Sequence, residues 1–198
     1  MWSAPRRPAE TSRVTGGRPA VPAVPRQRTA EAHLDIGMLV AAPSPGSVVA
    51  RARALVRDAL RERGIPVAEV EDAELAVAEL AVNAERHGRP PYEVRIFEVA
   101  AVPVWCEVVD ADPGLGRIPA MLDREAALTA ADLFAESGRG LLLVRALSGG
   151  YCRAYRTATF TTDAPAKTVA FALPTSSGTR LTYPPLFHLA RHQARLLP

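Results

Sequence analysis

Residues 71–88 (EDAELAVAELAVNAERHG) most constrain what this chain can fold into, because they read as one amphipathic helix. The apolar residues that would face the core recur at helical spacing: Val70, Ala73, Val77, Leu80, Ala81 and Ala84. Glu79, Asn83 and His87 are each four residues apart, so they stack in a row beside that stripe. A carboxylate and a carboxamide one turn apart can hold a hydrated cation. Taken alone, such a pair is more often a solvated decoration.

The order of elements around this helix predicts an α+β fold. A strand is expected over 33–41, followed by a helix with Ser44 as candidate cap, Pro45 at its first position and Gly64 at its end. After the helix of residues 71–88, two alternating segments predict an antiparallel hairpin. Two consecutive helices before antiparallel strands do not suit a parallel doubly wound sheet. The expected architecture is a two-layer α/β sandwich, with helices on one face of a mixed, mostly antiparallel sheet. Its remaining elements are the hairpin strands 92–99 and 104–109, a helix over 137–147, and strands over 151–156, 158–162 and 167–173.

Both ends of the chain are expected to lie outside the ordered domain, which is predicted over 33–174. Residues 1–32 are rich in Pro, Arg, Ala and Gly without periodicity, which is typical of disorder. Residues 175–198 form a polar tail, in which 186–197 could make a short amphipathic helix. Inside the domain, residues 117–136 give a mixed signal, with weak helical character over 123–134, and are interpreted as a mobile connection.

Charge and cysteine content narrow the classes of function. The formal net charge is +3, but residues 1–33 carry +4 and residues 175–198 carry +3, so the middle is acidic at −4. A folded part without basic excess argues against direct nucleic-acid binding. No apolar run approaches the ~20 residues of a membrane span, and no secretory leader is evident. Cys106 and Cys152 have neither metal-site nor disulfide-framework spacing, so a reducing cytoplasm is expected.

Two glycine-containing segments add chemistry to the helix. The acid–glycine turn 110–116 (DADPGLG) directly follows a predicted buried strand, where ligands often bind. At Gly138-Arg139-Gly140, unpaired backbone N–H groups and the positive end of a helix would attract phosphate, and glycine would let it approach. The same glycines could equally open a helix that binds nothing. No GxxxxGK[ST] motif is present, which excludes a P-loop as the phosphate site.

Three of these segments together resemble a known family. ELAVNAERHG, VVDADPGLG and SGRGLLLVRAL are similar to the N, G1 and G2 boxes of the GHKL ATPase superfamily, in the same order and at fitting spacing. The resemblance covers about residues 33–174. Within the superfamily it points to stand-alone anti-sigma-factor serine/threonine kinases and related ATP-binding regulators. It implies the Bergerat fold, with ATP and Mg²⁺ as cofactors.

The resemblance also implies roles for individual residues. Glu79 would be the general base and Asn83 the Mg²⁺ ligand, whereas His87 would either serve the site or only end the helix. The acid that accepts the adenine amino group is Asp110, directly after the strand, or Asp112, which fits D-x-G-x-G better; Asp110 is favoured. Strand parity does not separate the two, because both point the same way. The remaining positions expected to bind nucleotide are Gly114, Gly116, Gly138, Arg139, Gly140, Leu141 and Thr168.

The resemblance predicts an ATP–Mg²⁺-binding regulator that phosphorylates a partner protein on serine or threonine and controls a sigma factor. The expected partners are a sigma factor, its antagonist (an anti-anti-sigma protein), or both, and the first helix offers a face for a homodimer. The alternative is a catalytically silent ATP-binding module that acts by contact alone. An upstream phospho-accepting helix hairpin is not expected, which argues against a sensor histidine kinase.

Overall fold

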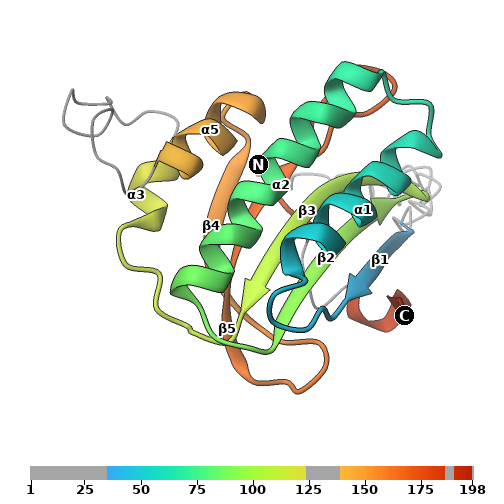
Figure 1. Ribbon diagram of the computed structural model, residues 1–198. Coiled ribbons are helices and arrows are strands. Elements are labelled where there is room, and N and C mark those ends of the chain that lie inside the picture. The colour runs from blue at the N-terminus through green and yellow to red at the C-terminus, as the bar shows by residue number, and fades with distance from the viewer. Residues whose placement is uncertain (1–34, 124–138, 186–189, 198) are drawn as a thin grey trace, which may run out of the picture. The chain divides into compact units, whose positions relative to one another are not determined.

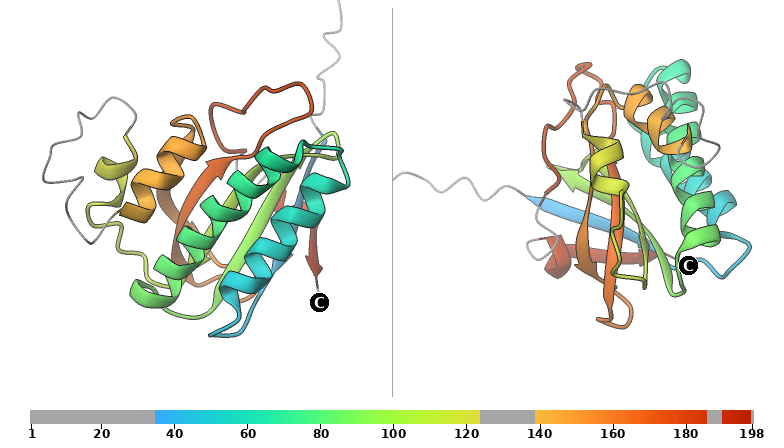
Figure 2. Two further views of the ribbon diagram at one scale, coloured as in Figure 1. Left: turned by 45° about the horizontal axis from the view of Figure 1, so that its top comes forward. Right: turned by 90° about the vertical axis from the view of Figure 1, so that its left-hand side faces the viewer.

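A computed structural model of the protein describes residues 35–123, 139–185 and 190–197, all of which belong to the compact unit His33–Pro198. They form one six-stranded sheet with helices packed on one face (Figure 1). Viewed along the sheet, the three longest helices lie together on one side of it (Figure 2). The fold is therefore an α+β sandwich, which confirms the predicted class.

The described helices are α1 (Val48–Arg61), α2 (Val67–His87), α3 (Ile118–Leu122) and α5 (Arg139–Leu147). The strands are β1 (Ile36–Ala41), β2 (Tyr92–Val99), β3 (Val102–Asp110), β4 (Cys152–Ala158), β5 (Pro165–Ala172) and β6 (Ala194–Leu197), the last preceded by a 3₁₀ turn, Arg191–Gln193. The strand order is β4-β5-β3-β2-β1-β6. All neighbours are antiparallel except β1 and β6, which are parallel, so the sheet is mixed and mostly antiparallel.

Both faces of the central strands are buried. On β2, Tyr92, Val94 and Ile96 face the helices, and the alternate residues face the opposite side of the sheet, yet both sets are shielded from solvent. All six residues of the stripe predicted for α2 are buried against the sheet and α1. A second, smaller core that includes Phe97 and Trp105 covers the other face.

The start of α1 differs from the prediction of a Ser44 cap with Pro45 at the first helical position. Residues 44–47 instead form a turn with Gly46 at φ +81°, in which Ser47 Oγ donates to the carbonyl of Ser44 over 2.7 Å. The helix begins at Val48, and the first N–H groups are met from α2: Glu85 Oε1 accepts from Gly46 N (2.7 Å) and Val48 N (3.3 Å). A carboxylate at a helix N-terminus satisfies free N–H groups and complements the helix dipole. The cap is therefore supplied by tertiary structure.

Two predictions for the C-terminal half are wrong. The strand expected over 158–162 stops at Ala158 and is followed by a turn, in which Thr159 N and Asp163 N join the backbone bonds that close it. In the helix expected over 186–197, the described residues form the 3₁₀ turn and β6, which pairs with β1. Of the connection expected over 117–136, residues 124–136 lie outside the described residues. Its described start contains α3, a short helix that the sequence did not predict.

Candidate functional site

A cavity of about 800 Å³ opens between α2, α3 and α5 above the ends of β3 and β5. Three elements that are far apart in sequence build its polar wall: the C-terminal half of α2, the end of β3 and the start of α5. Its lining consists of polar residues spaced one turn apart on α2, several cationic side chains, and mainly aliphatic side chains. The lining residues are Glu79, Leu80, Val82, Asn83, Ala84, Arg86, His87, Val108, Asp110, Arg117, Ile118, Met121, Arg139, Gly140, Leu141, Lys167 and Val169.

The polar row of α2 lies along one side of this cavity. Glu79, Asn83 and His87 all line it, because the neighbouring apolar stripe is held against the sheet and turns this row toward the opening. Glu79 is in close contact with the start of α5, so that a side chain at position 140 would collide with its Oε2. The absence of a side chain at Gly140 thus lets the Glu79 carboxylate approach the start of α5.

Of the two acids in the G1 segment, the structure places Asp110 in the cavity and Asp112 outside its lining. Asp110 is the last residue of β3, and its side chain is 5% exposed, against 35% for Asp112. Gly88, which caps α2, packs directly on Asp110: a Cβ there would lie 2.6 Å from Asp110 Oδ1. The end of α2 and the end of β3 therefore meet at this carboxylate.

Asp112 and the glycines that follow it shape the turn after β3. Asp112 Oδ1 accepts from the backbone N–H of Gly114 over 3.1 Å, and Gly116 has φ +52°, which favours glycine. The Gly114 N–H, and then the ammonium of Lys167, hold the pKa of Asp112 below its usual value. Neither Gly114 nor Gly116 lines the cavity. Gly138 lies outside the described residues.

On β5 the cavity residues are Lys167 and Val169, and Thr168 between them lies on the opposite face. Lys167 is the cross-strand partner of Asp110, and partners in register point to the same face. The adjacent Thr168 points the other way and is fully buried, and its hydroxyl donates to the carbonyl of Val108 over 3.2 Å. Thr168, which the resemblance gave as a nucleotide-binding position, is therefore not among the residues that line the cavity. Lys167 forms ion pairs with Asp110 (2.8 Å) and Asp112 (3.1 Å).

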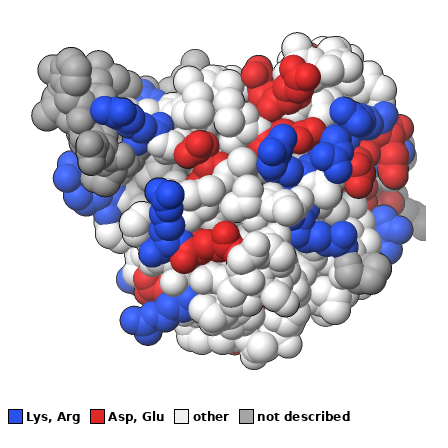
Figure 3. Space-filling view, viewed as in Figure 1, with Lys and Arg blue, Asp and Glu red and all other residues white. Residues whose placement is uncertain are grey.

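Two cations that the sequence did not point to, Arg86 of α2 and Arg117 just before α3, also line the cavity. The predicted Arg139 at the start of α5 lines it as well. Seen from the helix side, Lys and Arg side chains lie along the left of the molecule and also across its centre and right, interleaved with Asp and Glu (Figure 3). Leu141, Ile118 and Met121 contribute apolar wall. The cations of this cavity can hold an anionic group, and its apolar wall can hold a flat ring. The cavity can therefore bind a molecule that carries both.

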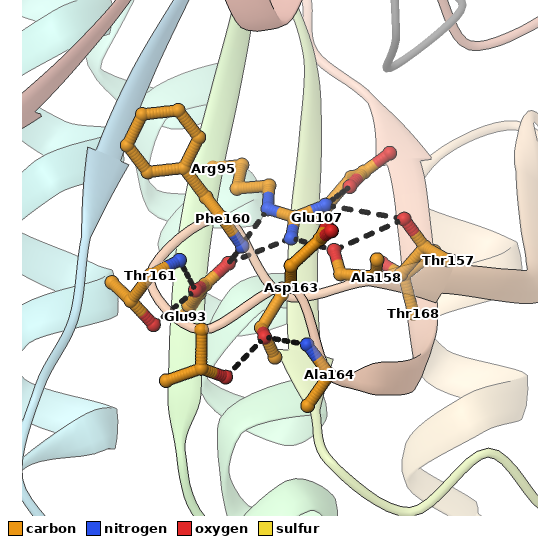
Figure 4. Close-up of polar contacts among 12 residues, drawn as sticks. Glu93, Arg95, Glu107, Thr157, Ala158, Phe160, Thr161, Asp163, Ala164 and Thr168 are labelled. Atoms are coloured by element: carbon orange, nitrogen blue, oxygen red, sulfur yellow. Dashed lines mark hydrogen bonds and ion pairs between the residues drawn. The ribbon is translucent and has the colours of Figure 1, made fainter.

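On the opposite face of the sheet, β2 and β3 carry a buried charge cluster (Figure 4). Arg95 donates to Glu93 Oε2 (2.6 Å) and Glu107 Oε2 (3.3 Å), and all three side chains are fully buried. Glu93 also accepts from the backbone N–H groups of Phe160 and Thr161, both at 2.9 Å. The cluster therefore ties β2 and β3 to the turn between β4 and β5.

The two carboxyls of this cluster have opposite pKa shifts. Burial raises the pKa of Glu107, beyond what Arg95 and the donated hydrogen bond of Tyr155 can offset. Burial also acts to raise the pKa of Glu93, but Arg95 and the two N–H groups outweigh it and leave that pKa below its usual value. Glu93 is thus the acid that the cluster holds as a carboxylate.

Comparisons with known proteins identify the family of the chain. The chain matches the histidine kinase-like ATPase domain family over residues 42–161, more than half of its length. No curated protein matches it. Among solved structures it is similar to the mycobacterial sensor histidine kinase MprB, at 18% identity and a TM-score of 0.36, over 64% of this chain and 94% of that one. A similarity this remote does not support any conclusion about the function of the protein.

The protein therefore belongs to the histidine kinase-like ATPase domain family. This supports the resemblance to the GHKL superfamily, and membership implies nucleotide binding, usually together with Mg²⁺. In the described residues, none of the helices has the length and apolar character that crossing a bilayer requires.

Proposed function

We propose that this protein binds Mg²⁺–ATP in the cavity beside α2 and transfers the terminal phosphoryl group to a serine or threonine of a partner protein. The observation that carries the proposal is the placement of Glu79 and Asn83, one turn apart on α2, in a cavity that also holds Gly140 and Asp110. The residues that we propose as base, metal ligand and adenine acceptor thus line the same space as the start of a helix.

The nucleotide fits this cavity in one orientation. Asp110 stands at the sheet end, where a carboxylate can accept from an exocyclic amino group of adenine. Arg86, Arg117 and Arg139 supply positive charge for the phosphates, as does the start of α5. The aliphatic side chains between these ends suit the faces of a purine ring.

The donor set also suits Mg²⁺. Mg²⁺ prefers oxygen ligands, keeps several waters and is commonly held by one or two protein groups together with phosphates. The carboxamide oxygen of Asn83 provides such a group, and within the described residues no cluster of three or more His, Cys, Asp or Glu side chains offers a different metal site. When bound, the ion would neutralise charge on the phosphates.

Glu79 would take the proton from the attacking hydroxyl. Its carboxylate lies next to Gly140, at the helix start that would face the phosphates, so an attacking group placed there would be within its reach. Most of the catalysis would come from positioning and charge neutralisation, as in other phosphoryl transfers.

The regulatory part of the proposal is that the phosphorylated partner is an antagonist protein and that this controls a sigma factor. What supports it is the resemblance of the three boxes, on a single small domain, to anti-sigma-factor serine/threonine kinases. The cytoplasm is the compartment in which such partners would be met.

Radiolabelled ATP and the cognate antagonist protein test the proposal. Wild type should transfer label to the antagonist, and Glu79→Gln should lower the rate by about 10²–10⁴-fold while ATP affinity changes little. Glu71→Gln is the matched control, since it makes the same substitution at an exposed position of the same helix. If wild type binds Mg²⁺–ATP but transfers no label, or if Glu79→Gln transfers as fast as wild type, the kinase proposal fails. The first result would favour a silent ATP-binding module that acts by contact.

A further inference from the structure

Lys167 is the only lysine in the chain, which otherwise takes its positive charge from 23 arginines. It does not lie on the surface, where lysine is usually found. Instead it lines the nucleotide cavity and only 7% of its side chain is exposed. All the remaining Lys or Arg positions of the sequence are arginine. The reason for a lysine at position 167 should therefore lie in its own surroundings.

The geometry explains why the residue is lysine. Its ammonium donates to Asp110 Oδ1 (2.8 Å), to the backbone carbonyl of Asp112 (3.1 Å) and to Asp112 Oδ2 (3.1 Å). An ammonium group has three donors, and here each meets an acceptor. A guanidinium is a larger, planar fork suited to bidentate partners, which does not match three acceptors around one small point.

This arrangement distinguishes the two oxygens of Asp110. Both donors that reach the carboxylate from the described part of the chain, Lys167 Nζ and the Asp112 N–H, bond to Oδ1. Gly88 packs against the same carboxylate, which limits its rotation. Oδ2 is therefore the oxygen that remains for a ligand in the cavity.

We propose that Lys167 is a positioning residue that clamps Asp110 through Oδ1, and that the clamp makes the site select 6-amino purines over 6-oxo purines. This rests on the proposed nucleotide binding. A carboxylate only accepts, so Oδ2 attracts the amino group of adenine and repels the carbonyl oxygen of hypoxanthine or guanine. Lys167, which lies beside this carboxylate, cannot donate to that oxygen because its three donors are already engaged.

Equilibrium binding of Mg²⁺–ATP and Mg²⁺–ITP tests the clamp, because the two nucleotides differ only on one edge of the base, where ITP has a carbonyl oxygen at the 6-position and a proton on N1. Wild type should bind ATP about 10- to 100-fold more tightly than ITP, the range of one hydrogen bond to a charged group. Lys167→Met should reduce that ratio to below about 5-fold. A merely structural role would weaken both nucleotides alike and leave the ratio as in wild type.

Arg156→Met is the matched control. Arg156 is the cross-strand neighbour of Lys167 on β4, and its Nε donates to the carbonyl of Pro113 in the same turn (3.4 Å), but it is exposed and does not line the cavity. Loss of this cation should leave the ATP-to-ITP ratio unchanged. If the control lowers the ratio as much as Lys167→Met, general charge explains the effect and the clamp is refuted.

Asp110→Asn keeps the test available if Lys167→Met does not fold. With Lys167 in place, the carboxamide oxygen should occupy the Oδ1 position, where two donors converge, so its NH₂ group takes the place of Oδ2. The variant should then prefer ITP to ATP. An ATP preference that survives in both variants overturns the clamp. Failure of wild type to bind either nucleotide overturns the clamp and the proposed function together, whereas selective binding without phosphoryl transfer supports the clamp and refutes only the kinase.

Discussion

Replacing Gly88 by alanine should force apart the end of α2 and the end of β3. Gly88 has φ −104°, which any residue adopts, so its backbone does not require glycine. What requires it is space: a Cβ would lie 2.6 Å from Asp110 Oδ1 and 2.7 Å from the backbone oxygen of Ala84. Both distances are well inside van der Waals contact, and one partner is rigid backbone. The added methyl group must therefore displace Asp110 or unwind the last turn of α2.

The expected loss is about 1–3 kcal/mol in the free energy of unfolding, the usual range for overpacking a well-packed site. Displacing Asp110 should also weaken ATP binding by about tenfold, because the carboxylate would leave the position that Lys167 holds. Urea unfolding followed by circular dichroism measures the first quantity, and equilibrium ATP binding measures the second.

Gly37→Ala is the matched control for this prediction. Its Cβ would lie 3.5 Å from Glu98 Oε2, an ordinary contact, on a strand far from the cavity lining. The control should stay within about 0.5 kcal/mol of wild type and bind ATP normally. The reasoning is refuted if Gly88→Ala matches the control in both stability and affinity.

Three further predictions concern the rest of the fold. Arg95→Met should destabilise the protein by about 3–5 kcal/mol, because it leaves Glu93 and Glu107 buried without their cation, and urea unfolding should show this. The fold lowers the pKa of Glu93 from its ordinary value of 4.5, so the ion pair should stabilise the protein above pH 4.5 and be lost as the pH falls below it. Glu93→Gln should make the free energy of unfolding less dependent on pH in this acidic range. Ala101→Gly should raise the unfolding temperature and increase the free energy of unfolding by about 1 kcal/mol. Ala101 has φ +61° in the hairpin turn, a conformation that is unfavourable for a residue with a Cβ and open to glycine.

The helix that carries the candidate site could be predicted from sequence because its signals are local. A repeat of three to four residues determines which side of a helix is apolar, and all six predicted stripe residues of α2 are buried. Once that side is packed, helix geometry alone turns Glu79 and Asn83 toward the neighbouring elements. Similar local signals, alternation and a short link, predicted the β2–β3 hairpin.

Other features depend on elements that meet only in three dimensions. The charged residues Glu93 and Arg95 on β2 resemble a solvated strand face, but the turn after β4 closes over them and supplies N–H donors. The start of α1 is capped by Glu85 from α2, and no motif near α1 in the sequence predicts this contact. The last strand, β6, exists because β1 offers a free edge.

By itself the sequence determined the α+β class, the helix with its polar row and the two glycine-containing segments, since each depends on spacing along the chain. Only the tertiary structure decided which acid and which β5 residue face the cavity. Asp110 and Asp112 have the same parity, so what separates them is that Asp110 still pairs within β3 whereas Asp112 lies beyond its end. The register of β5 on β3 then places Lys167, and not Thr168, beside that acid. Register is a relation between strands 57 residues apart, and no single segment contains it.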